Sequence, residues 1–318
     1  MSGQLFHYSV FGLAVTSNLA LPGLHPPAGQ GSPLRIDAVR AQDFAAPESP
    51  PHCASGFEAH WHVEDGRWLS RYGEGSGTPL WAMEAHSGGA QLDVRWSEPG
   101  QLHDIPAVVQ GAGFAMALHL RGAFILHASV VAVAGRAILV IGDSGAGKSS
   151  TAAALVRGGC PLVSDDMAVL DVVGEGMAVR RGPLRMRVYE DSARAAGWTG
   201  TLPKLFRHPI FEDKRYIDVT NTLQSETAGV CAIFVLEPRD RSAARLSVEP
   251  LSPRAALGPL LRNIYRAPFL DGARGKIAAE RCAWIAGSIP VVTVHRLDSL
   301  DALPDIAAAI TQYASALV

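Results

Sequence analysis

Near the middle of the chain, eight residues have the types and spacing of a phosphate-binding loop. Residues 142–149 read Gly-Asp-Ser-Gly-Ala-Gly-Lys-Ser and match the pattern G-x-x-x-x-G-K-[ST]. Glycines let successive backbone N–H groups curl around an anion, and the helix that follows directs its positive end at the same phosphates. In such loops the lysine, here Lys148, reaches the β- and γ-phosphates, and the serine hydroxyl, here Ser149, binds Mg²⁺.

The loop predicts ATP and Mg²⁺ as the cofactors. An apolar run precedes the loop and a helical pattern follows it, which disfavours the alternative of a glycine-rich turn without a ligand. The predicted cofactor-binding residues are Gly142, Asp143, Ser144, Gly145, Ala146, Gly147, Lys148, Ser149 and Ser150.

Two adjacent carboxylates, Asp165 and Asp166, follow the apolar run of "PLVSDDMAVL". Ligands of α/β sheets bind at the ends of strands, and neighbouring residues of a strand point in different directions. One carboxylate can therefore hold Mg²⁺ while the other faces an incoming nucleophile. The alternative is a pair of aspartates in a turn, which the apolar run from Met167 to Val173 disfavours.

His127 lies within the apolar run of residues 123–133. A single histidine in such a run is most often a core residue. The run is followed by "AGR" and "AILVIG", which predicts a hairpin that brings His127 towards the phosphate loop. There the imidazole would orient or tune a catalytic base. The spacing leaves both readings open.

The segments around these residues alternate between strand and helix patterns. The predicted fold class is α/β, with a mixed sheet because two hairpins are expected. Strands are predicted at residues 123–133, 137–142, 161–173, 177–181, 230–238 and 289–297, and helices at about 147–159, 253–266 and 273–287.

Residues 1–118 differ from the rest because short alternating runs and Gly/Pro breaks predominate. We predict a smaller, largely β domain at 1–118, with a role in substrate recognition, and a phosphate-loop domain at 119–318. Residues 108–122 have helical spacing and are expected to link the two. No metal site is expected at His60 and His62, because no third ligand is nearby.

Four basic residues are candidate contacts of phosphate or substrate. Arg185 and Arg187 alternate after Gly182-Pro183, and Lys214 and Arg215 lie in "EDKRY" on an expected loop. The alternatives are a solvated strand edge for the first pair and a plain surface loop for the second. Tyr265 is expected in the core.

Composition excludes several classes of function. The chain has 318 residues, is 48% hydrophobic and carries a formal net charge of −2, without a long basic run, so nucleic acid is not an expected partner. No segment approaches about 18 uninterrupted apolar residues, and the first residues do not resemble a signal peptide. The four cysteines are far apart. A cytoplasmic protein is therefore expected, and an oligomer remains open.

His127, "GDSGAGKSS" and "VSDDMAVL" together resemble the catalytic domain of bacterial HPr kinase/phosphorylase, which is related to phosphoenolpyruvate carboxykinase. The resemblance covers residues 121–171 strongly and the remainder weakly. It implies a serine kinase in which Asp165 is the catalytic base, Asp166 joins Ser149 at the metal, and His127 lies close to both aspartates. Lys148 holds the phosphates. The two roles within the aspartate pair could be exchanged.

The chain also departs from that family. Residues 180–190 read "RRGPLRMRVYE" where the family has a long glycine-rich signature, and the N-terminal half differs. The segments "YSVFGLAVTSNLALPGL" and "GPLRMRVYEDSARAAG" are similar to the HPr-kinase-like enzymes of lasso-peptide gene clusters. That similarity implies phosphorylation of the C-terminal serine of a ribosomally made precursor peptide.

The predicted function is a Mg/ATP-dependent kinase that transfers the γ-phosphoryl group to a serine hydroxyl of a peptide. One alternative is a kinase of HPr, of another protein or of a small molecule on the same catalytic domain. A further alternative is an ATP-binding regulatory protein without transferase activity.

Overall fold

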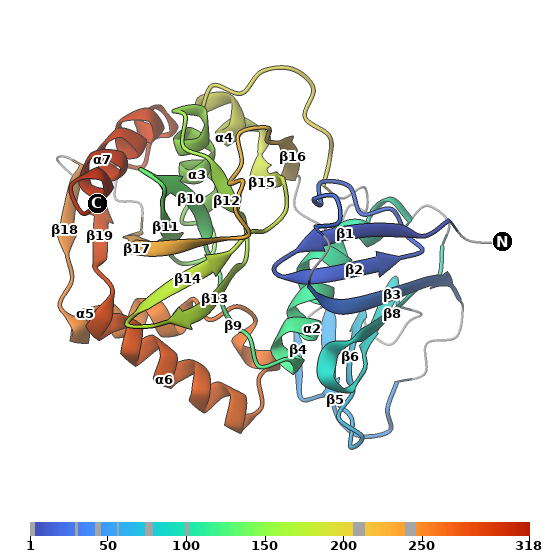
Figure 1. Cartoon of the computed structure of the whole chain (residues 1–318). Helices are drawn as coiled ribbons and strands as arrows, with labels where there is room; N and C mark the ends of the chain where they lie inside the picture. The colour runs from blue at the N-terminus through green and yellow to red at the C-terminus, as the bar shows by residue number, and fades with distance from the viewer. Residues whose placement is uncertain are drawn as a thin grey trace. The chain divides into compact units, whose positions relative to one another are not determined.

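The computed structural model describes residues 4–28, 31–41, 46–55, 57–73, 79–98, 102–205, 214–238 and 246–318. The chain forms two compact units (Figure 1). The first unit comprises Met1–Ala123, Leu205–Glu212 and Arg266–Asp271, and the second comprises Phe124–Lys204, Asp213–Tyr265 and Gly272–Val318. No helix in the described ranges is long and apolar enough to cross a membrane.

The first unit is built on an eight-stranded sheet with the strand order β1-β2-β3-β8-β7-β6-β5-β4. Leu92 and Val94 of β8 are fully buried and alternate with half-buried residues, as expected for a strand with one face on a core. The short alternating runs of this region form strands, and "FEAHWHV", "RWLSRYG" and "AQLDVRW" contain β5, β6 and β8. The strands are β1 (Phe6–Val10), β2 (Leu13–Ser17), β3 (Ser32–Arg40), β4 (Cys53–Ser55), β5 (Glu58–His62), β6 (Trp68–Tyr72), β7 (Trp81–Ala85) and β8 (Gln91–Trp96).

A helical segment completes the first unit. It consists of α1 (Ile105–Val108), a π-helical turn (Val109–Gly113) and α2 (Phe114–Leu120), and nearly all its residues are buried. A helix that is apolar on all sides belongs inside a core. The predicted helix is confirmed, but it lies within the first unit.

The second unit contains a nine-stranded mixed sheet, which confirms the predicted α/β class. Strand β17 pairs in parallel with β11 and β19 and antiparallel with β14. The strands of this sheet are β9 (Phe124–Leu126), β10 (Ser129–Val133), β11 (Arg136–Ile141), β12 (Leu162–Ser164), β13 (Ala168–Val173), β14 (Gly176–Arg180), β17 (Thr227–Leu236), β18 (Ser247–Pro250) and β19 (Val291–His295).

Helices cover both faces of this sheet (Figure 1). On one face α3 and α7 pack together over β10, β11 and β17, around the fully buried Phe234, Val140 and Ile310. Burial of each large apolar side chain contributes about 1.5–3 kcal/mol. The helices are α3 (Lys148–Arg157), α4 (Glu190–Ala195), α5 (Pro253–Arg262), α6 (Gly272–Ser288) and α7 (Leu303–Ser315).

A separate two-stranded ribbon pairs β15 (Arg185–Tyr189) with β16 (Lys214–Asp218). The prediction that Lys214 and Arg215 lie on a loop is wrong, because both residues pair with β15 as the first residues of β16. The prediction failed because "EDKRY" is mostly polar, so the alternation of buried and exposed side chains was not visible in it. In the strand, Ile217 packs on the core and Asp218 faces solvent. The first two letters, residues 212 and 213, lie outside the described ranges.

Two strands that the sequence predicts as continuous are interrupted. The run of residues 123–133 breaks at His127 and Ala128 into β9 and β10, and the run of residues 161–173 breaks at residues 165–167 into β12 and β13. Because β9 pairs with β13 and β10 pairs with β12, the two interruptions lie opposite each other. This pairing brings His127 and the aspartate pair together.

Candidate active site

The phosphate-loop sequence forms a tight connection from β11 to α3. Gly147 has φ +92° at the N-cap of α3, and Gly142 has φ +152° at the end of β11. A Cβ at Gly142 would lie 2.9 Å from the carbonyl oxygen of Leu236. Glycine is therefore required at both positions. The turn places Lys148, Ser149 and the buried Ser150 in the first turn of α3, where backbone N–H groups are available to an anion.

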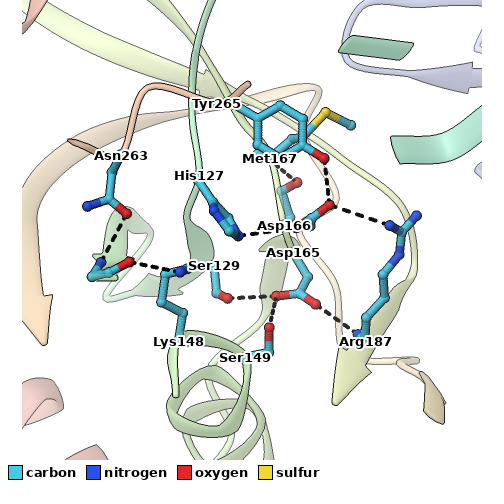
Figure 2. Close-up of polar contacts among 12 residues, drawn as sticks. His127, Ser129, Lys148, Ser149, Asp165, Asp166, Met167, Arg187, Asn263 and Tyr265 are labelled. Atoms are coloured by element: carbon cyan, nitrogen blue, oxygen red, sulfur yellow. Dashed lines mark hydrogen bonds and ion pairs between the residues drawn. The ribbon is translucent and has the colours of Figure 1, made fainter. Parts of the chain in front are cut away.

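Lys148 is buried against its own loop. Its Nζ donates to the carbonyl oxygens of Gly142 at 2.8 Å and Asp143 at 3.3 Å (Figure 2). Burial lowers the pKa of Lys148, and the charges of Asp166 and Asp165 oppose that shift. Two of the three ammonium N–H groups are used by the loop, and the third can be directed at a phosphate.

Residues distant in sequence brace the loop. The Asn263 side chain accepts from the backbone N–H of Gly142 at 3.2 Å and donates to the carbonyl of Pro259 at 2.9 Å. The Asn263 backbone carbonyl accepts from the N–H of His127 at 2.7 Å. Arg296 donates to the carbonyl of Ala146, and exposed Arg262 pairs with Asp143 at 3.3 Å.

Asp165 is almost fully buried and is linked to the first turn of α3. Its Oδ1 accepts from the hydroxyls of Ser129 at 2.6 Å and Ser149 at 3.1 Å. Its Oδ2 accepts from the backbone N–H of Arg187 at 2.8 Å. Burial raises the pKa of Asp165, although the hydrogen bonds oppose that shift. The site thus favours a positive charge close to this carboxylate.

Asp166 has a different environment (Figure 2). Its backbone is left-handed, with φ +72°, which is uncommon for aspartate. Its Oδ1 lies 3.3 Å from His127 Nε2, while its Oδ2 accepts from the Tyr265 hydroxyl at 2.9 Å and lies 3.4 Å from Arg187 Nη1. Burial opposes the charge, but the contacts with His127, Arg187 and Tyr265 outweigh it and hold the pKa of Asp166 well below its usual range. This carboxylate is therefore ionised.

The structure brings most of the predicted residues together. His127, Lys148, Ser149 and the two aspartates lie in one cluster with Arg187 (Figure 2). Ser149 is hydrogen-bonded to Asp165, whereas the family resemblance placed Asp166 on the metal side.

The other three basic candidates have different contacts. Arg185 pairs with Asp218 at 2.7 Å, Lys214 lies over the ring of Tyr189, and Arg215 pairs with Glu190 at 3.1 Å.

Sequence reasoning missed Ser129, Asn263 and Tyr265. Tyr265 is buried as expected, but its hydroxyl is bound to Asp166. A buried tyrosine hydroxyl usually has a hydrogen-bond partner, and that rule was the one available signal.

The hydroxyl of Ser149 and the carboxylate of Asp165 are suitable ligands for Mg²⁺. They are hard oxygen groups and lie within hydrogen-bond distance of each other. Protein Mg²⁺ sites commonly use one or two such groups and complete the shell with substrate phosphates and water. Within the described ranges, no group of three His, Cys, Asp or Glu side chains could hold a metal ion.

The same part of the chain is similar to a known family. Residues 119–187 match the family model described as "HPr Serine kinase C-terminal domain". The matched segment runs from the end of α2 into β15, and it contains His127, the phosphate loop and both aspartates.

Individual relatives agree with that match. The chain is 44% identical over 57 residues to the HPr kinase/phosphorylases of two strains of Treponema pallidum, one of which is the Nichols strain. The aligned part spans 18% of this chain and 18% of those relatives. The structure of the Hpr(Ser) kinase/phosphatase from Coxiella burnetii aligns with 59% of this chain and 95% of its own, at 15% identity and a TM-score of 0.31. That TM-score is too low to support an argument from the shared structure.

Proposed function

We propose that the chain is a Mg/ATP-dependent kinase that transfers the γ-phosphoryl group to a serine hydroxyl. The observation that carries the proposal is that the two aspartates have different contacts. Asp165 is bonded to the serine of the phosphate loop, and Asp166 is bonded to His127, Arg187 and Tyr265. Neighbouring carboxylates whose pKa values are shifted in opposite directions indicate two different catalytic roles.

The loop and Lys148 bind the triphosphate of ATP in this proposal. Backbone N–H groups of residues 142–148 surround the β- and γ-phosphates, and Lys148 directs its remaining N–H at them. The charge of Lys214 acts on Lys148 and lowers its pKa, so both ammonium groups lie within electrostatic reach of the same region. A bound triphosphate would stabilise both charges.

Ser149 and Asp165 would hold Mg²⁺. In phosphate-loop enzymes a carboxylate completes the metal site with the loop hydroxyl, and Asp165, which directly follows β12, is hydrogen-bonded to that hydroxyl. Mg²⁺ held by these two residues would neutralise charge on the phosphates. We therefore exchange the two roles that the family resemblance implies, and assign the metal to Asp165.

Asp166 serves as the base. Its Oδ2 already accepts from Tyr265 and lies near Arg187, whereas its Oδ1 contacts His127. A carboxylate oxygen has two lone-pair positions, so Oδ1 can also accept the serine hydroxyl. The hydroxyl proton passes to Asp166 as the serine oxygen attacks the γ-phosphorus, and the bond from that phosphorus to the β–γ bridging oxygen breaks as ADP leaves. His127 keeps the carboxylate oriented.

The acceptor is a serine-bearing peptide, and more specifically the C-terminal serine of a ribosomally made lasso-peptide precursor. The similarity of residues 8–24 and 182–197 to enzymes of lasso-peptide clusters supports this choice. We assign substrate recognition to the N-terminal region and place the activity in the cytoplasm, where ATP is available.

Two single substitutions test the proposal with labelled ATP and a precursor peptide ending in serine. Asp166→Asn should retain Mg-dependent ATP binding and lose transfer by about 10²–10⁴-fold, the usual contribution of a general base. Asp165→Asn should weaken ATP binding only when Mg²⁺ is present. Transfer by Asp166→Asn at the wild-type rate would contradict the assignment of the base.

The acceptors distinguish the alternatives. Label that passes to a small metabolite or to HPr, and not to the peptide, would favour another kinase substrate. Label that passes to no acceptor would favour a regulatory ATP-binding protein.

A further inference from the structure

Ser129 is the first residue of β10 and lies between the two strands that carry the site. One neighbour, β11, leads into the phosphate loop, and the other, β12, leads into Asp165. Ser129 pairs with Val140 near the end of β11, and Val130 pairs with Ser164 at the end of β12. Ser129 is 1% exposed, and all of these elements belong to the second unit.

The Ser129 hydroxyl makes the shortest of three hydrogen bonds that described residues form with Asp165 (Figure 2). It donates to Oδ1 at 2.6 Å, compared with 3.1 Å for the Ser149 hydroxyl at the same oxygen and 2.8 Å for the Arg187 backbone N–H at Oδ2. A carboxylate that binds a metal ion is ionised and only accepts hydrogen bonds. Hydrogen bonds to an ionised acceptor are short and about twice as strong as neutral ones.

These contacts leave one position of Asp165 open to a cation. A carboxylate has about four lone-pair positions, and the donors among the described residues fill both positions of Oδ1 and one of Oδ2. The Ser149 hydroxyl gives its single hydrogen to Oδ1, so its own lone pairs stay available. Ser129 therefore holds the carboxylate without occupying the position that faces a cation.

The segment of residues 127–129 supplies a different partner to each of the two adjacent carboxylates. His127 Nε2 lies 3.3 Å from Asp166 Oδ1, whereas the Ser129 hydroxyl is bonded to Asp165. Asp165 is 6% exposed, and a buried polar group that loses a partner is destabilised. The Ser129 hydroxyl thus stabilises the charged form of Asp165 in the orientation that the structure shows.

We propose that Ser129 is a positioning residue for the metal site, and that its hydroxyl holds the Asp165 carboxylate in the orientation that binds the cation together with Ser149. The proposal rests on the proposed function in its assignment of Mg²⁺ to Asp165 and Ser149. It predicts that loss of the Ser129 hydroxyl weakens binding of the metal ion, and leaves metal-free binding of the nucleotide unchanged.

A titration without turnover tests the proposal. Mn²⁺, a paramagnetic substitute for Mg²⁺, is added to the full chain with a non-hydrolysable ATP analogue, and the free ion is measured by EPR. Ser129→Ala should raise the Kd for Mn²⁺ by about 10–100-fold, the usual effect of losing a hydrogen-bond partner of a metal ligand. The affinity for the same analogue in EDTA should stay unchanged. A wild-type Kd for Mn²⁺ overturns the proposal, and so does an equal loss of affinity for the analogue in EDTA.

The transfer assay gives a second readout for Ser129→Ala. The Mg²⁺ concentration at half the maximal rate should rise by the same factor, and saturating Mg²⁺ should restore the wild-type kcat. A lower kcat with an unchanged Mg²⁺ dependence would place the effect of Ser129 outside the metal site and overturn the proposal.

Thr293→Val is the matched control. Thr293 lies on β19 of the same sheet and is 4% exposed, and its hydroxyl donates to the carboxylate of Glu237 at 3.1 Å. The substitution removes a buried strand hydroxyl from a carboxylate that the proposed function does not use, so the Kd for Mn²⁺ should stay at the wild-type value. An equal loss in Ser129→Ala and Thr293→Val would show a general effect on the sheet and would overturn the proposal.

A double-mutant cycle separates this proposal from the proposed function. Asp165→Asn should lose most of the affinity for Mn²⁺, and Ser129→Ala should add no further loss to it, because the hydroxyl acts through this carboxylate. Independent, multiplied losses would overturn the positioning role. A loss in Asp165→Asn with none in Ser129→Ala would overturn this proposal alone. Wild-type affinity in Asp165→Asn would overturn the metal assignment of the proposed function, and this proposal with it.

Discussion

Asn263 connects the phosphate loop to α5, and its replacement by alanine tests how the loop is held. The side chain accepts from the buried N–H of Gly142 at 3.2 Å. Without the Asn263 side chain, the buried N–H of Gly142 has no acceptor, which lowers the free energy of unfolding by about 1–3 kcal/mol. The Pro259 carbonyl also loses the donated bond of 2.9 Å, but it still accepts from the Asn263 backbone N–H at 3.2 Å. We expect Asn263→Ala to lower the free energy of unfolding by about 2 kcal/mol.

The expected effects of Asn263→Ala appear in stability and in ATP binding. A loss of about 2 kcal/mol lowers Tm by about 4–8 °C in a domain of this size. ATP affinity should fall by about tenfold, because Gly142 no longer has a fixed direction at the start of the loop. Differential scanning fluorimetry gives the first quantity and isothermal titration calorimetry the second.

Asn221→Ala is the control for Asn263→Ala. Asn221 also donates from its side chain to a backbone carbonyl, that of Gly159 at 2.9 Å, but it is exposed and follows β16. We expect a change within about 0.5–1 kcal/mol and an unaltered ATP affinity. The reasoning is refuted if Asn263→Ala matches this control in both measurements.

Three further substitutions test the loop, the metal side and the N-terminal sheet. Gly142→Ala should lower the free energy of unfolding by about 2 kcal/mol or more and abolish ATP binding, because its Cβ would lie 2.9 Å from a carbonyl oxygen. Gly135→Ala is the control, because a Cβ there meets open space. It should retain ATP binding in the same calorimetric titration. Burial raises the folded-state pKa of Asp165, so its contribution to stability is present below the unfolded pKa and is lost as pH rises through the folded pKa. Asp165→Asn should therefore be at least as stable as the wild type at neutral pH, and should lose any rise of Tm on adding MgCl₂ and ATP; a retained rise would contradict the metal assignment. Burial lowers the pKa of His60 from 6.5 to about 3, so stability should decrease by up to about 1.4 kcal/mol per pH unit as pH falls below 6.5, and His60→Phe should remove this slope in urea titrations.

Local patterns predicted the parts of the site that are contiguous in sequence. The phosphate loop depends on the spacing of its own glycines and on Lys148, and the structure forms the expected strand, turn and helix there. The hairpin from β10 to β11 likewise follows from one apolar run on each side of a turn. Such features need no knowledge of distant residues.

Other parts of the site depend on long-range pairing. Nothing in the helical pattern around Asn263 shows that its side chain reaches Gly142, because the contact joins residues that are 121 positions apart. The different contacts of Asp165 and Asp166 also could not be predicted from sequence, since they depend on the interruption between β12 and β13 and on the left-handed backbone of Asp166. Lys214 shows the converse error, because a polar stretch became a strand once β15 supplied its partner.

The composition of the N-terminal unit has a practical consequence for dividing or exchanging parts of this protein. A fragment that begins after residue 118 would contain Phe269, which is 5% exposed, but would lack His60, on which the ring of Phe269 stacks, and Glu58, which pairs with Arg266. Its apolar ring and the charge of Arg266 would then be left without their partners, which favours aggregation. Chimeras with related proteins should therefore transplant residues 266–271 together with the N-terminal sheet, although the two are encoded by separate stretches of the gene.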